Sequence, residues 1–307
     1  MGLIEQDSNA SHSVSSSSAP AESTAAFLSL LGSGVVWGLS WWPLKFFAGE
    51  GLSGHAIGLT AYSLVGLVAL PFIWRERALW RGELRYLLLI GLFFGFANMA
   101  FTSALMTGSV VRAMLLFYLL PVWGTLGGWL FLKERIGPRR LLAVVLSLAG
   151  VFVIMGDADV FKQPLSLADF MALAAGFCYT AASVVNRKAH RIPVASRTLV
   201  SFVGCMFVAS VALLFTVPDV PAVSGTTWLM LVLFAFIWLL GGTLLTTYGV
   251  MHVQASRAAV LQVVELLVAV VSAVLLGGEV LTAKDWIGGA MIIAATLIEA
   301  TTDMNKG

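Results

Sequence analysis

The sequence predicts an all-α integral membrane protein with ten transmembrane helices, arranged as two inverted five-helix repeats. Three observations lead to this fold class: the composition, the length of the apolar runs, and a repeated pattern of polar residues. Of the 307 residues, 59% are apolar and only 11% are charged. Soluble domains carry about 25% charged residues, so this chain could not cover a surface that faces water.

Ten apolar runs are long enough to cross a bilayer, which takes about 20 residues of helix. They are separated by short segments rich in charged residues, Gly and Pro, such as RERALWRGE and KERIGPRR. The runs are 26–48, 55–74, 84–106, 109–132, 139–157, 166–187, 196–217, 227–250, 255–277 and 283–301. Residues 1–25, rich in Ser and Ala, are expected to form a disordered cytoplasmic tail. The tail lacks a basic leader segment, so we expect the first run to be retained as a helix.

The distribution of Lys and Arg predicts the orientation, because cytoplasmic loops are enriched in these residues. If the N-terminus is cytoplasmic, the loops after runs two, four and six carry four basic residues each. Of the 18 Lys and Arg residues, the opposite side then holds only Lys45, Arg112, Lys162 and Lys284. We therefore expect a multi-pass protein of the inner (plasma) membrane with both termini in the cytoplasm.

An internal repeat divides the chain into five-helix units at 26–157 and 166–301. A shift of 145 residues places Arg112 on Arg257 and Glu134 on Glu279, at the start and end of runs four and nine. A shift of 142 places Trp37 on Tyr179. Because each unit has an odd number of spans, the units enter the membrane in opposite directions. Inverted repeats are characteristic of secondary transporters, with the binding site near the midplane.

The segments VVWGLSWWPLKF, LLFYLLPVWGTLGGWLFLKERIGPRRLLAVVLSLAGVFVI and LQVVELLVAVVSAVLLGGEVLTAKDWIGGAMIIAATLI resemble the drug/metabolite transporter superfamily, specifically its EamA type. The resemblance covers 26–301. It implies a ten-helix transporter for metabolites or drugs, often an exporter. One departure is that the second half has Glu265–Leu266 where Leu120–Pro121 stands in the first, and members of the family commonly keep a proline there.

Small residues spaced four apart predict close packing between helices. Gly34 and Gly38 lie on one face of the first run. Further pairs occur at the same spacing in runs four and nine, namely Gly124 with Gly128 and Ala269 with Ala273.

Aromatic residues at mid-membrane indicate a substrate pocket. Trp37 lies about 17 Å along the helix from position 26, too deep for an interfacial anchor, and Trp41 follows one turn later. An indole face there suits an aromatic, apolar or cationic solute. The other candidates are Asn98, Tyr179, Trp238 and Tyr248. The alternatives are interfacial anchoring for the Trp residues and plain hydrogen bonds between helices for the rest.

Glu265 stands at the centre of the ninth run, with Gln262 one turn earlier. A carboxylate there costs about 2.5–3.5 kcal/mol on insertion scales, so it must face a cavity or a polar group, or carry a proton. The sequence therefore predicts proton coupling through Glu265 and substrate contact through Gln262. The alternative is a structural hydrogen bond, to Gln262 or to a tyrosine.

Other function classes find little support in the residues. The basic residues form no patch that would suit nucleic acid. Cys178 and Cys205 lie in apolar runs without metal-ligand spacing, so we expect free thiols, no metal and no cofactor. We expect no enzyme activity, because no HExxH, GxSxG or paired in-membrane carboxylate occurs. We therefore expect a transporter of a small molecule, for which a monomer is sufficient. The alternatives are an enzyme that acts on lipid and a receptor or scaffold that does not transport.

Overall fold

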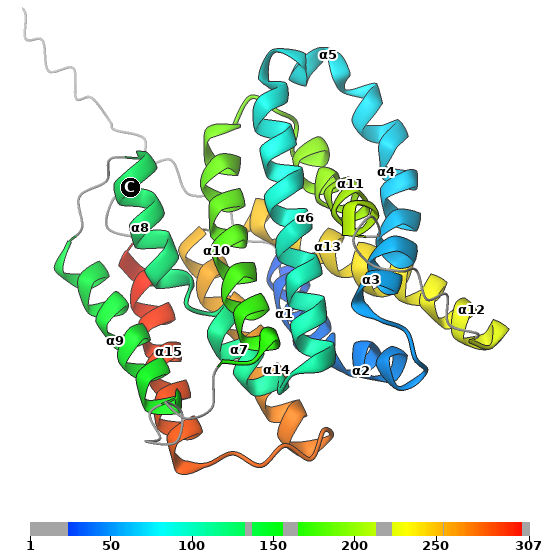
Figure 1. The fold of residues 1–307 in the computed structure, drawn as a ribbon. Coiled ribbons are helices and arrows are strands. Elements are labelled where there is room, and N and C mark those ends of the chain that lie inside the picture. Colours follow the sequence, from blue (N-terminus) through cyan, green and yellow to red (C-terminus); the bar gives the residue numbers. More distant parts are fainter. Residues whose placement is uncertain (1–23, 133–136, 156–164, 213–222, 254, 303–307) are drawn as a thin grey trace, which may run out of the picture.

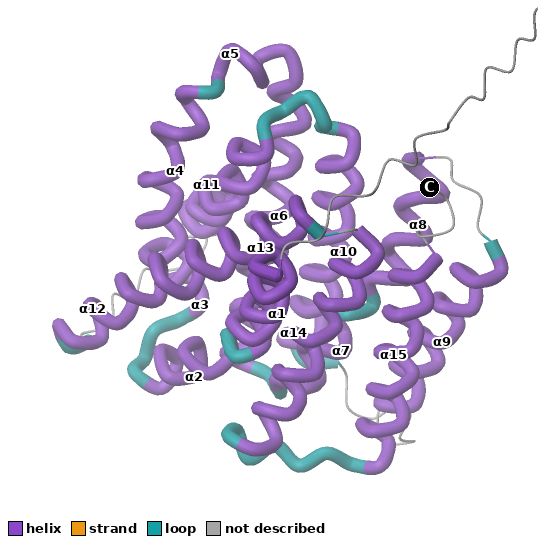
Figure 2. The backbone as a smooth tube through the Cα atoms, turned by 180° about the vertical axis from the view of Figure 1, so that it is seen from behind, coloured by secondary structure: helices purple, strands orange, loops and turns teal. Residues whose placement is uncertain are grey.

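The structure, a computed structural model, describes residues 24–132, 137–155, 165–212, 223–253 and 255–302. Every regular element in these ranges is helical (Figure 2). The predicted disordered tail lies outside the described residues, apart from its last two positions.

The first half contains eleven helical segments, two of them short π- or 3₁₀-helices. These are α1 (Thr24–Gly38), α2 (Trp41–Gly49), α3 (Gly54–Ile57), η1 (Gly58–Tyr62), α4 (Ser63–Arg75), α5 (Arg77–Trp80), η2 (Arg81–Glu83), α6 (Leu84–Thr107), α7 (Val110–Phe117), α8 (Leu120–Leu132) and α9 (Pro138–Met155). The second half has longer, less interrupted helices. These are α10 (Leu167–Lys188), α11 (Val194–Ala212), α12 (Gly225–Leu233), η3 (Phe234–Leu240), α13 (Gly241–His252), α14 (Ala255–Leu275) and α15 (Ala283–Thr302).

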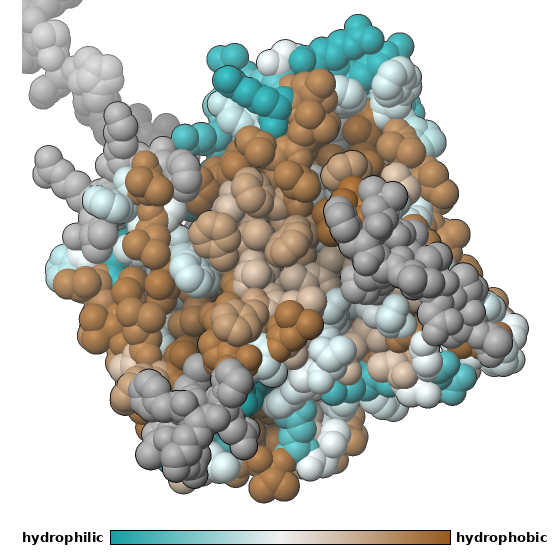
Figure 3. All heavy atoms as spheres, viewed as in Figure 1, coloured by the Kyte–Doolittle hydropathy of each residue, from teal (hydrophilic) through white to brown (hydrophobic). Residues whose placement is uncertain are grey.

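Each predicted apolar run corresponds to one helix or to consecutive helices in the chain. In the described ranges, seven helical stretches are long and apolar enough to cross a membrane. Large apolar side chains are exposed along their outer faces, including Ile237 at 68% and Trp74 at 62%. Figure 3 shows apolar residues over the middle of the visible face and polar residues gathered at its two ends. This surface fits a bilayer, in which helices satisfy their own backbone hydrogen bonds, and the chain is an integral membrane protein.

Two of the runs in the first half are broken by proline. Pro43 lacks the N–H that would bond the Leu39 carbonyl, and the regular α-helical hydrogen bonds are interrupted at residues 39–40, where Ser40 N–H bonds the Trp37 carbonyl oxygen and Trp42 N–H bonds the Leu39 carbonyl oxygen. Pro121 acts in the same way on the Phe117 carbonyl, and the break falls between α7 and α8 at residues 118–119.

The two halves pack against each other through equivalent helices (Figure 1). Helix α1 packs against α13 and α14 of the second half, and α10 packs against α6, α7 and α8 of the first. Helix α6 also lies along α11, and α9 lies along α15. The halves therefore surround a shared central region.

Glycines allow the closest of these approaches. A Cβ atom at Gly38 would lie 2.7 Å from the Glu265 carbonyl oxygen, and one at Gly176 would lie 2.6 Å from the Phe117 carbonyl oxygen. The predicted close packing of Gly34 and Gly38 is thus present. For Gly124 the prediction is wrong, because no atom would lie within 4 Å of its Cβ. The surroundings of Gly128 lie outside the described residues.

Candidate substrate cavity

A cavity of about 460 Å³ lies between the two halves. Its wall is built mainly by α1, α6, α10, α11, α13 and α14, together with the break between α7 and α8. Nearly all of the side chains that line it are aromatic, hydroxyl-bearing or apolar. Two charged residues are among them, Glu265 and Arg197.

Aromatic rings form one part of the wall. The ring of Tyr179 packs edge-on against Phe94 and Phe117, with centroids 5.3 Å and 5.5 Å away. Trp37 of α1 forms another part of the wall. Its indole N–H donates to Thr246 Oγ1 of α13 over 3.0 Å, which fixes the orientation of the ring. Because the N–H is already satisfied, Trp37 offers a solute its aromatic face. Such a wall suits stacking or cation–π contact.

Glu265 contributes the acidic group of the cavity. It projects from the middle of α14, at the level where Gly38 of α1 contacts its backbone. Its carboxyl group interacts with the hydroxyl groups of Tyr118 and Tyr179. No salt bridge to a basic side chain is formed by Glu265 within the described part of the chain. Among the described residues, therefore, no basic partner holds this carboxyl group in its charged form.

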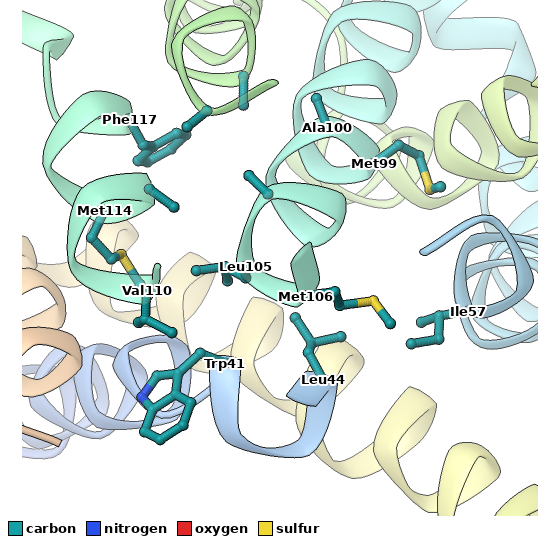
Figure 4. Packing of buried hydrophobic residues seen from close by; sticks show 14 of the residues in the cluster. Trp41, Leu44, Ile57, Met99, Ala100, Leu105, Met106, Val110, Met114 and Phe117 are labelled. Atoms are coloured by element: carbon teal, nitrogen blue, oxygen red, sulfur yellow. The ribbon is translucent and has the colours of Figure 1, made fainter. Parts of the chain in front are cut away.

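The cavity is closed at the end away from α5. Figure 4 shows Trp41, Leu44, Leu105, Met106 and Val110 converging there, and all five are buried. The indole N–H of Trp41 donates to Ser272 Oγ over 2.9 Å, which ties this cluster to α14.

Polar contacts hold the same closed end together. The Glu279 carboxylate, before α15, accepts hydrogen bonds from Ser109 Oγ (2.9 Å) and from the backbone N–H groups of Val110 (2.8 Å) and Val111 (3.2 Å). A carboxylate at the N-terminus of α7 is favourable because the helix dipole is positive there. Arg112 pairs with Asp169 over 3.0 Å. The second half is thus bonded to the first at this end, and the contacts of Glu279 with residues 109–111 are called the Glu279 latch below.

The cavity extends in the other direction to Asn186, Arg197 and Thr198. These residues lie at the connection between α10 and α11, beside the buried cluster that includes Trp80 of α5 and Ile192. The α5 end is the upper end in Figure 1.

Comparison with known proteins agrees with this architecture. The model of the EamA-like transporter family matches residues 24–156 and again 166–300. The chain belongs to the EamA-like transporter family. A protein described as an uncharacterized transporter from Archaeoglobus fulgidus is 27% identical over 232 residues, covering 76% of this chain and 81% of the relative. A solved crystal structure, described only as that of a protein, shares the fold with a TM-score of 0.59 at 20% identity, covering 93% of this chain and all of the other.

The family establishes a multi-pass membrane transporter with a small-molecule substrate. Four predicted site residues of this EamA-like transporter line its cavity: Trp37, Asn98, Tyr179 and Glu265. The Asn98 side chain donates to the Phe94 carbonyl oxygen within α6 (2.8 Å), so its amide oxygen remains available. The side chain of Gln262 lies outside the described residues.

The structure does not bring Trp41, Trp238 and Tyr248 to the cavity wall of this EamA-like transporter. Trp41 lies below the cavity, and a turn at residues 39–40 interrupts the α-helical repeat between it and Trp37. The indole N–H of Trp238 donates to the Val36 carbonyl oxygen of α1 over 2.9 Å. Tyr248 faces outward, 43% exposed, and stacks on His252.

The π-helical segment η3 explains the position of Tyr248. Trp238 lies inside η3, and a π-helix bonds i to i+5, so the regular α-helical repeat that would place Tyr248 on the same face as Trp238 is interrupted. The residues of α13 that line the cavity are Thr243, Thr246 and Thr247.

The polar or charged lining residues that were not predicted in this EamA-like transporter include Tyr118, Asn186 and Arg197. Tyr118 stands inside an apolar run, at the break before Pro121. Arg197 and Asn186 stand at helix ends, where basic and amide residues are usually solvated. The available signal was the phenol of Tyr118 in an apolar run, three residues before Pro121.

Proposed function

We propose that this transporter exports a small organic solute from the cytoplasm by alternating access, using the central cavity as its binding site. The observation that carries the proposal is the asymmetry of the cavity. It is shut by Trp41, Leu44 and the Glu279 latch at one end and extends to the α10–α11 connection at the other. A solute would therefore load from the α5 end.

The α5 end is assigned to the cytoplasm on charge. Arg75, Arg77, Arg81 and Arg85 lie in or beside α5. Arg187 and Lys188 end α10, and Arg191 follows in the connection to α11. Lys and Arg are enriched in cytoplasmic loops. The proposed location is therefore the inner membrane, with both termini in the cytoplasm.

Alternating access would be carried by movement of one half against the other. The breaks at 39–40 and 118–119 supply positions where helix segments can change angle, since no continuous ladder of hydrogen bonds crosses them. Opening the far end would require the latch of Glu279 on α7 to separate and the Trp41 cluster to part. The same motion would have to close the cavity at the connection between α10 and α11.

Proton coupling is proposed to run through Glu265. The group lines the cavity and has no basic partner among the described side chains, and its only polar neighbours identified there are two phenols. Proton uptake from outside would accompany release of the solute. Proton return to the cytoplasm would then reset the carrier for export.

A counterflow assay in liposomes tests the proposal. Purified protein is reconstituted, the vesicles are loaded with a panel of unlabelled metabolites, and uptake of labelled solute is measured. Exchange that depends on the protein supports transport. A receptor would bind solute without exchange, and an enzyme acting on lipid would leave altered lipid without exchange.

The Trp37→Ala variant links transport to the cavity. We expect counterflow to fall by about tenfold or more, since removing a buried aromatic anchor typically costs about 2 kcal/mol or more of binding free energy. The matched control is Trp42→Ala, because Trp42 is 58% exposed on the outer surface. An equal loss of counterflow in both variants would contradict a role of Trp37 in substrate binding.

A further inference from the structure

The guanidinium group of Arg197 lies in the cavity wall without an acidic partner. Its Nη1 donates to the backbone oxygen and to Oδ1 of Asn186, both over 3.0 Å. No salt bridge reaches it within the described ranges, whereas Arg112 pairs with Asp169 and Arg191 with Glu83. The cavity therefore contains a positive charge that the described protein does not neutralise.

The unused edge of this guanidinium group has the geometry that binds carboxylates. Asn186 occupies only Nη1, and the Nε–H is buried with no hydrogen-bond partner. The edge formed by Nε and Nη2 is one of the two through which arginine makes paired bonds to a carboxylate. A buried donor left unsatisfied costs about 1–3 kcal/mol. An incoming carboxylate would remove that cost.

Nearby groups strengthen an anion site. The hydroxyl-bearing residues Thr198 and Ser201 of α11 line the same part of the cavity. Arg197 stands in the first turn of α11, where the helix dipole is positive. Asn186, from the last turn of α10, holds the guanidinium group in place.

The aromatic wall lies deeper in the cavity at a measurable spacing. Tyr179 and Asn186 are both on α10, seven residues apart, which corresponds to about 10 Å along the helix. Phe94 and Phe117 pack on Tyr179 and extend the aromatic surface at that level. A solute with a carboxylate, a short linker and a small aromatic ring is long enough to reach from the guanidinium group to this surface. The acidic Glu265 is at the Tyr179 level and would repel a second carboxylate there.

We propose that Arg197 and Asn186 form a carboxylate-binding site and that the transported solute is an aromatic carboxylate. Its carboxylate lies on the free edge of Arg197, and its ring lies among Tyr179, Phe94 and Trp37. Glu265 then serves the proton and not the solute. This assignment rests on the proposed export function and specifies its substrate class.

Three compounds of one shape test the assignment: 3-phenylpropanoate, its neutral amide, and 3-phenylpropylamine. Binding to the full-length protein in detergent is measured by isothermal titration calorimetry. The carboxylate is expected to bind at least about tenfold more tightly than the amide, because a charge-assisted paired bond is lost in the amide. Equal binding of acid and amide, or tightest binding of the amine, overturns the proposal without any variant.

Variants then locate the effect. Arg197→Gln should lower the affinity for the carboxylate by about tenfold or more while changing that for the amide by less than about twofold. Arg187→Gln is the matched control, since Arg187 is exposed at the same end of α10. A loss in Arg187→Gln equal to that in Arg197→Gln contradicts the site.

Counterflow with the labelled carboxylate separates the two proposals. Selective, Arg197-dependent binding without exchange supports the site and contradicts the export function. Exchange that ignores the carboxylate supports transport and contradicts the site.

Discussion

The two halves of the molecule share a fold but contribute differently to the cavity. In the first half, the helices next to the cavity are interrupted before Pro43 and before Pro121. In the second half, the equivalent helices α10 and α14 run without a break for 22 and 21 residues. Both charged lining residues, Glu265 and Arg197, come from the second half. In these two pairs of equivalent helices, the first half has the bending points and the second half has the continuous helices, one of which carries Glu265.

This difference has a physical reason. A charged group in the membrane needs a fixed environment, because its cost depends on the partners that it meets. A continuous helix fixes the position of Glu265 opposite Tyr118 and Tyr179. Proline breaks remove backbone hydrogen bonds and lower the cost of changing the helix angle. One half can therefore move while the other keeps the site ordered.

The largest effect is expected from Glu265→Gln. The amide keeps the size of the side chain but cannot cycle a proton, so accumulation of solute driven by an imposed pH gradient should fall to the background level. Counterflow without a gradient should continue. Both are measured in liposomes. Asp285→Asn is the control, since it changes an exposed carboxylate at the start of α15. If the Glu265→Gln protein keeps full transport driven by the pH gradient, Glu265 has a structural role and does not couple transport to protons.

A proline exchange tests the continuity of α14. Leu266→Pro introduces a break where the first half has Pro121, and it removes a backbone hydrogen bond inside a helix. We expect a loss of stability of about 3 kcal/mol or more. Pro121→Leu should change stability by less than about 1 kcal/mol and slow counterflow, because it lets α7 join α8. Thermal unfolding in detergent compares them, and equal destabilisation would contradict the contrast between the halves.

Glycine substitutions probe the contacts between the halves. Gly38→Ala and Gly176→Ala each place a Cβ against a backbone carbonyl oxygen, at 2.7 Å and 2.6 Å. Each should destabilise the protein by about 1–3 kcal/mol. Gly124→Ala has no neighbour within 4 Å and should lose nothing, since alanine favours helix. A thermal midpoint for Gly38→Ala as high as that for Gly124→Ala would show that α1 and α14 are not in close contact.

Much of the fold could be predicted because the bilayer imposes it. Apolar runs of the right length must be helices, and a glycine pair such as Gly34 and Gly38 marks a contact face. The cavity position of Glu265 also followed from the cost of its charge. These inferences depend on composition and on spacing along one helix.

The remaining errors arose where the helix was not regular. The face shared by Trp37 and Trp41 exists only in an unbroken helix, and the one linking Trp238 to Tyr248 does not survive the π-helical η3. Arg197 was assigned to a solvated loop because its depth depends on how α11 packs beside α6, which the sequence does not encode locally. Tertiary packing therefore decided which polar residues reach the cavity.

The smallest expected effect concerns the latch by which the second half holds the first. Glu279→Gln keeps a hydrogen-bond acceptor for Ser109 and Val110 but removes the charge at the N-terminus of α7. Capping and dipole contributions of this kind are worth about 1 kcal/mol. A bias of that size shifts a two-state equilibrium about fivefold.

Cysteine labelling measures this shift. In a background with Cys178→Ala and Cys205→Ala, a Met106→Cys probe reports opening of the closed end, because Met106 is buried there and does not line the cavity. An impermeant maleimide applied from outside should label the Glu279→Gln protein about fivefold faster than the parent. Asp285→Asn, a carboxylate at the same end that does not contact α7, should leave the rate unchanged. If Glu279→Gln also leaves it unchanged, the contact caps α7 without controlling the opening. Labelling from the cytoplasmic side alone would reverse the proposed orientation.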